Sequence, residues 1–145
     1  MIVFKVLYET NVVIINAVRL QVDAVTFTDN KTKSAQHGTA SLQKDIERLT
    51  LFFEDALHVG TGILTISFRG VINTDSMKGL FTSKVNGEAS RPNYVTFFAP
   101  TYARNCFPCW DEPASKATFV ITLIVPKDRQ ALSNMVITHL ALIMQ

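Results

Sequence analysis

The chain has 145 residues, of which 48% are hydrophobic and 18% are charged, and its formal net charge is +2. This length fits one domain with its own core, and the high apolar share predicts a surface that something else covers. Lysine and arginine are scattered, so the charge pattern excludes the usual signatures of nucleic-acid binding and of attachment to an acidic membrane.

Alternation of apolar and polar residues is the dominant pattern along the chain and predicts β-strands. The expected strands cover residues 12–15, 20–28, 63–68, 94–98 and 119–125, and the last should be buried on both faces. Turn signals stand at Asp29-Asn30, Gly60-Thr61-Gly62, Asn86-Gly87 and Pro126-Lys127-Asp128. Short strands at this spacing predict an all-β fold, an antiparallel β-sandwich or barrel.

Residues 41–57 have a different pattern. Five apolar residues fall at helical spacing behind Ser41, a suitable N-cap: Leu42, Ile46, Leu49, Phe53 and Leu57. Taken alone, this segment predicts an amphipathic helix.

The two cysteines, Cys106 and Cys109, form a Cys-Phe-Pro-Cys string. Such a string is typical of thiol oxidoreductases, in which a helix N-terminus lowers the pKa of the first cysteine. Here Asp111 and Glu112 follow at once and disfavour a thiolate, so we favour a structural role. A zinc site would need two more ligands, and none is near in sequence.

Two stretches resemble the N-terminal domain of the gluzincin zinc aminopeptidases, closest to the puromycin-sensitive aminopeptidase and aminopeptidase N branches. The first is residues 60–84, which includes Gly-Thr-Gly-Ile-Leu-Thr-Ile-Ser-Phe-Arg-Gly. The second is residues 103–135, which begins Ala-Arg-Asn-Cys-Phe-Pro-Cys-Trp-Asp-Glu-Pro. The residues that carry this second motif are Arg104, Phe107, Pro108, Cys109, Trp110, Asp111, Glu112 and Pro113.

In that family the N-terminal domain is a saddle-shaped β-sandwich that packs against a thermolysin-like catalytic domain. The resemblance implies the same antiparallel β-sandwich here, truncated at both ends. It implies a strand at residues 48–53, and we side with that strand against the helix. We expect the domain to cover residues 1–135 and to be followed by an apolar tail, residues 136–145, that is unlike the family.

The family's chemistry requires a His-Glu-x-x-His helix with a distant Glu to hold zinc. The three histidines, His37, His58 and His139, have no such partners, and the Gly-x-Met-Glu-Asn motif that grips the substrate's free amine is missing. We therefore expect no metal ligand, no zinc and no catalytic residue in this chain.

The family's N-terminal domain also lends a Gln and a Glu to the substrate's amino end. The matching positions here are Phe97 and Ala99. A methyl group cannot pair with an ammonium as a carboxylate does, so this supporting role is lost. Arg104, Asp111 and Glu112 form either a charged catalytic cluster or a structural ion-pair corner, and we favour the corner.

The sequence thus predicts a non-catalytic, truncated aminopeptidase-like protein. One alternative is an interaction module that binds an aminopeptidase, or itself, through an apolar face and open strand edges. Others are a thiol redox protein and a product without selected function. We see no signal peptide and no uncharged run of the ~18–20 residues needed to cross a bilayer, so we expect a cytoplasmic protein.

Overall fold

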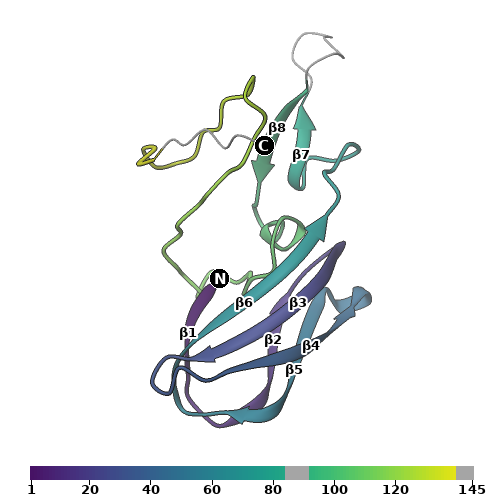
Figure 1. The fold of residues 1–145 in the computed structure, drawn as a ribbon. Helices are drawn as coiled ribbons and strands as arrows, with labels where there is room; N and C mark the ends of the chain where they lie inside the picture. The colour runs from purple at the N-terminus through teal and green to yellow at the C-terminus, as the bar shows by residue number, and fades with distance from the viewer. Residues whose placement is uncertain (84–91, 140–145) are drawn as a thin grey trace. The chain divides into compact units, whose positions relative to one another are not determined.

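The computed structural model describes residues 1–83 and 92–139. The chain divides into two compact units, Met1–Ser115 and Lys116–Gln145. Within the described residues, all strands lie in the first unit, and the only helical pieces are two three-residue 3-10 turns (Figure 1). None of these pieces is long or apolar enough to span a membrane. The predicted all-β, antiparallel fold is confirmed.

Six strands form one antiparallel sheet in the order β1-β6-β3-β4-β5-β2. Their bounds are β1 Ile2–Val6, β2 Thr10–Asn16, β3 Leu20–Asp29, β4 Ala35–Gln43, β5 Arg48–Leu57 and β6 Gly60–Gly70. The 3-10 turn η1, Lys44–Ile46, connects β4 to β5. The strands predicted at residues 12–15, 20–28 and 63–68 are therefore confirmed in β2, β3 and β6.

The sheet curls into a half-barrel, as Figure 1 shows. Its register shifts between Thr10 and Val12 in β2, and between Val22 and Ala24 in β3. Such bulges increase the local twist and bend a sheet. The Phe27 ring lies directly against Gly62 of β6. A Cβ at position 62 would overlap that ring, so this close contact requires glycine.

The core lies on the concave face of this sheet. Its twelve buried members are Val6, Val13, Ile15, Ala17, Leu20, Val25, Phe27, Leu49, Leu51, Phe53, Leu57 and Leu64. They come from five of the six strands and from the turn after β2, so one cluster ties the sheet together. Trp110, from far along the chain, packs against the same cluster.

A second, two-stranded sheet pairs β7, Gly79–Ser83, with β8, Asn93–Phe97. β8 confirms the strand predicted at residues 94–98. Gly79 opens β7 with φ +67, a left-handed conformation that favours glycine. Asn105, in the 3-10 turn η2 (Ala103–Asn105), lies where a Cβ of residue 79 would be.

The helical pattern at residues 41–57 is misleading, and the strand implied by the family resemblance is correct. Ser41 and Leu42 belong to β4, and Leu42 pairs with Leu49 of β5 across the η1 turn. Within β5, Leu49, Leu51 and Phe53 are buried and alternate with less buried neighbours. The spacing resembled a helix because Leu49, Phe53 and Leu57 are four apart on one face of β5, where every second residue shares a face. Ile46, in the η1 turn, is 52% exposed and only continues the pattern in sequence.

The predicted buried strand at residues 119–125 is wrong. Across residues 116–139 the structure has no strand, and Val120 is fully exposed while Ile121 is 57% exposed. An extended run becomes a strand only when a neighbouring strand pairs with its backbone, and no strand of residues 1–83 or 92–139 pairs with this run. The turn signal at Asn86-Gly87 and the end of the predicted tail, residues 140–145, lie outside the described residues.

Candidate functional site

The strongest sequence motif, residues 103–113, is attached to the end of β2. Asn16 and Cys109 form an antiparallel bridge: Asn16 N donates to Cys109 O at 2.7 Å, and Cys109 N donates to Asn16 O at 3.1 Å. The Asn16 side chain adds a third bond, since its Oδ1 accepts from Asp111 N at 3.2 Å. The motif segment therefore closes one end of the curled sheet.

Arg104 is the charged centre of this closing segment. Its Nε donates to Asp111 Oδ2 at 2.9 Å, and one terminal nitrogen donates to Glu47 Oε2 at 3.0 Å. The other terminal nitrogen donates to the backbone carbonyl of Asp111 at 3.2 Å. Only 12% of the Arg104 side chain is exposed, so this ion pair is largely shielded from solvent.

The electrostatics of this group fit a structural corner. Burial alone would lower the pKa of Arg104, but the hydrogen bonds and charges of Asp111 and Glu47 raise it. The guanidinium therefore stays charged, and each of its three nitrogens already has a partner. A guanidinium that is held on all three nitrogens by groups of its own chain is suited to fixing a loop.

The aromatic members of the motif pack inward. The Trp110 ring meets Phe4 edge-on at a centroid distance of 5.4 Å, and Phe107 meets Phe98 at 5.6 Å. Pro108 between them is buried, whereas Glu112 and Pro113 are exposed. The third charge of the ion-pair corner is thus Glu47, while Glu112 contributes a backbone carbonyl that accepts from Ser115 N at 3.0 Å.

Both thiols are free, and their surroundings favour the protonated form. Burial raises the pKa of Cys106, and burial together with the charge of Asp111 raises the pKa of Cys109 to about 12. Cys106 follows the η2 turn rather than beginning a helix. Because the thiolate is the reactive form, these positions lack the activation that a thiol oxidoreductase needs.

Phe97 and Ala99 lie at the end of β8 and just after it. The Phe97 side chain is half exposed, and its ring lies 6.3 Å from that of Tyr102. Ala99 is exposed and precedes a cis peptide bond to Pro100. Neither side chain has a polar atom, so this edge presents an apolar surface to whatever lies beside it.

The comparison with known families decides the identity. Residues 1–141 match the peptidase M1 N-terminal domain. The chain belongs to that family.

Curated relatives of this M1 N-terminal domain are aminopeptidases. Aminopeptidase M1 of Arabidopsis thaliana is 44% identical over 131 residues, which cover 88% of this chain and 15% of the relative. Aminopeptidase M1-C of Oryza sativa subsp. japonica is 40% identical over 135 residues, which cover 92% of this chain and 15% of the relative. Aminopeptidase N of Bos taurus is 42% identical over 91 residues, which cover 61% of this chain and 9% of the relative. The chain thus spans about 15% of the length of the two plant relatives.

The histidines of this M1 N-terminal domain are scattered. His37 lies exposed in β4, and its Nδ1 is 3.2 Å from Thr26 Oγ1. His58 follows β5 and pairs with Glu9 at 3.0 Å, and His139 is exposed. Over residues 1–83 and 92–139, no three His, Cys, Asp or Glu side chains gather to hold a metal.

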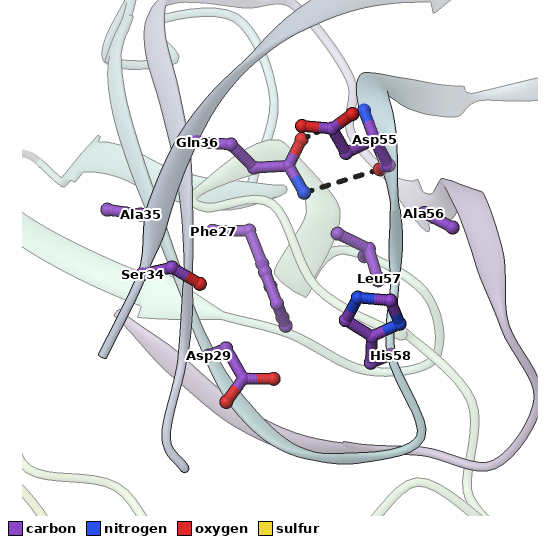
Figure 2. A pocket seen from close by; sticks show the side chains of 9 residues that line it. All are labelled: Phe27, Asp29, Ser34, Ala35, Gln36, Asp55, Ala56, Leu57 and His58. Atoms are coloured by element: carbon purple, nitrogen blue, oxygen red, sulfur yellow. Dashed lines mark hydrogen bonds between the residues drawn. The ribbon is translucent and has the colours of Figure 1, made fainter. Parts of the chain in front are cut away.

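A cavity of about 350 Å³ lies where β4 and β5 separate (Figure 2). The Gln36 side chain spans the gap: its Nε2 donates to Asp55 O at 3.3 Å, and its Oε1 accepts from Asp55 N at 3.2 Å. Asp29, at the rim, accepts from the backbone N–H groups of Thr32 and Lys31, which lower its pKa. These polar groups replace strand pairing, and they are not arranged for acid–base chemistry.

Glu47 is the residue of the corner that sequence reasoning missed. It is separated from Arg104 by 57 positions and lies in the segment with the helical pattern. Its only local signal is its place at the end of η1, with a left-handed φ of 56. A pairing of β4 with β5 predicted from the sequence would have placed it at a turn, but not beside Arg104.

Proposed function

We propose that this M1 N-terminal domain is a non-catalytic, structural part of an aminopeptidase-like protein. Removal of N-terminal residues from peptides is the activity proposed for the whole protein, by a zinc-bound water that other residues would supply. In this proposal the domain forms a folded wall beside such a centre and takes no part in the bond cleavage.

The observation that carries the proposal is the use of the motif's polar groups within the chain. Arg104 binds Asp111 and Glu47, while Asn16 binds the backbone of Cys109 and of Asp111. The Trp110 side chain packs against the hydrophobic core. A catalytic reading would need at least one of these groups to face a substrate with a free donor or acceptor, so structural use supports the non-catalytic role.

A peptidase assay with the purified 145-residue chain tests this. We expect no hydrolysis of alanyl- or leucyl-p-nitroanilide above a mock purification, with or without one equivalent of Zn²⁺. Equilibrium dialysis should find no stoichiometric zinc. Turnover that follows the chain's own peak through a second, different column, and scales with its amount, would refute the proposal. Arg104→Lys is the matched variant, since it keeps the charge and should leave the result unchanged.

The apolar surface of β8 favours a second candidate, an interaction module. Tyr94 and Phe97 are each about half exposed, and Val95 is 41% exposed, on one five-residue strand. A zinc peptidase domain is the partner we propose, because the relatives described above are aminopeptidases several times longer than this chain. Pull-down of a separately expressed peptidase domain of Aminopeptidase M1 should weaken in Phe97→Gln but not in Val3→Gln, an exposed apolar position on the edge strand β1. Equal binding by both variants would exclude β8 as the docking strand.

A further inference from the structure

We propose that the first unit carries a binding site for a compact, doubly charged oxyanion, of the phosphate or dicarboxylate class. The site is a cavity of about 250 Å³ whose lining includes Arg19, Glu47, Asn73, Lys78, Tyr102 and Asn105. It is separate from the β4–β5 gap of Figure 2 and goes beyond the structural role proposed above.

The walls of this cavity are fixed by backbone hydrogen bonds between segments far apart in sequence. Val18 N donates to Arg104 O at 2.8 Å and Ala17 N to Glu47 O at 3.2 Å, which holds the turn after β2 against the ion-pair corner. On the other side, Asn73 N donates to Leu80 O at 2.9 Å. A cavity with a bonded backbone on both sides is formed before any ligand arrives, so binding need not order it.

The charges in the cavity do not cancel. Arg19 and Lys78 each bring one positive charge, and within the described residues no carboxylate pairs with either of them. Glu47 is the one acid of the lining, and it shares the Arg104 guanidinium with Asp111. A lining in which two cations outnumber one acid favours an anion.

The neutral groups of the lining are suited to oxygen ligands. Asn73 and Asn105 carry amide N–H donors, and Tyr102 carries a hydroxyl. One Asn73 amide hydrogen is already donated to Lys78 O at 3.2 Å, and Lys78 Nζ is held 4.9 Å from the centre of the Tyr102 ring. The guanidinium of Arg19 can donate two parallel bonds to a phosphate or carboxylate. The size of the cavity suits a small ligand of this kind and excludes an extended peptide.

The backbone at the cavity supports a role for the Arg19 side chain. Arg19 has φ 57 and Glu47 has φ 56, so two of the three left-handed non-glycine residues of the described chain line this one cavity. Glycine or asparagine would adopt that conformation with less strain. Arginine at position 19 is therefore unfavourable for the turn itself, and its charge beside Lys78 supplies a reason for its presence.

Two-dimensional amide NMR titration with inorganic phosphate, at low ionic strength, tests the site. We expect saturable shifts of the Asn73 and Asn105 side-chain amides with one-to-one stoichiometry. Arg19→Asn keeps a left-handed turn and removes the charge, and Lys78→Met keeps the stem over Tyr102. Each should weaken phosphate binding about tenfold, because one of two charge-assisted contacts is lost.

Lys33→Asn is the matched control, since Lys33 is also a left-handed cation, with φ 60, but lies in the turn between β3 and β4. It should leave the affinity unchanged. Malonate titrated in the same way separates the two ligand sources: tighter phosphate binding assigns a phosphate group, and tighter malonate binding assigns a dicarboxylate. Absence of saturation by both, or an equal loss in Lys33→Asn, would overturn the proposal. The variants' own spectra show whether each still folds.

Discussion

Two runs with the same apolar alternation, in β6 and at residues 119–125, end in different states. Leu64 of β6 is fully buried, and its strand lies between β1 and β3. Leu123 of the second run is 54% exposed, and no strand of the described residues pairs with it. The difference teaches that alternation marks a segment able to become a strand, while the neighbouring strands decide whether it does.

The two regions should differ most in how much stability is lost when a central leucine of each run is replaced by alanine. Leu64→Ala should lower the free energy of unfolding by about 2–5 kcal/mol, because it leaves a cavity in a closed core. Leu123→Ala, the matched change, should alter it by less than about 0.5 kcal/mol. Urea unfolding followed by the fluorescence of Trp110, the single tryptophan, measures both. An equal loss in the two variants would show that residues 119–125 are packed, and the comparison would fail.

The ion-pair corner should behave as part of the closed region. Arg104→Met should lower the free energy of unfolding by about 2–3 kcal/mol, because it leaves the carboxylate of Asp111 shielded and unpaired. Arg69→Met is the surface counterpart: Arg69 holds Asp23 at 2.9 Å but is 71% exposed. Its loss should be small and should vanish in high salt. If Arg69→Met were as damaging as Arg104→Met, shielding would not be what distinguishes the corner.

Thiol reactivity should give the smallest difference, one seen in rates rather than in folding. With burial and Asp111 raising the pKa of Cys109 from 9.0 to about 12, its alkylation by iodoacetamide at pH 8 should be at least about 100-fold slower in the folded chain than in urea. Peptide mapping by mass spectrometry resolves Cys109 from Cys106. Rapid labelling of Cys109 under native conditions would mean that the closing segment opens readily.

The same thiol should make stability depend on pH at the alkaline end. Between pH 9 and about 12 the unfolded chain releases the Cys109 proton while the folded chain retains it. The folded state therefore loses stability as pH rises through this range. Cys109→Ala should reduce this decline relative to the parent chain, and an unchanged slope would contradict the role assigned to burial.

Much of the first unit could be predicted from period-2 alternation, since β2, β3, β6 and β8 are rich in β-branched and aromatic residues. β4 could not, because Ala35–Gln43 has few such residues and its strand state depends on β3 and β5 beside it. Only part of the ion-pair corner could be predicted from the sequence. Arg104 and Asp111 stand close in sequence, whereas Glu47 comes to them through the pairing of β4 with β5. Long-range partners of this kind leave no local pattern.

The bridge between Asn16 and Cys109 has a consequence for how the chain folds as it is made. All six strands of the curled sheet have been synthesised by Gly70, yet the bridge and the Phe4–Trp110 contact need residues 109 and 110. Such distant closure is slow, because a long loop must lose its freedom first. In the growing chain, the six strands of the sheet are therefore complete before the Phe-Pro-Cys-Trp string that closes one end of it has been made.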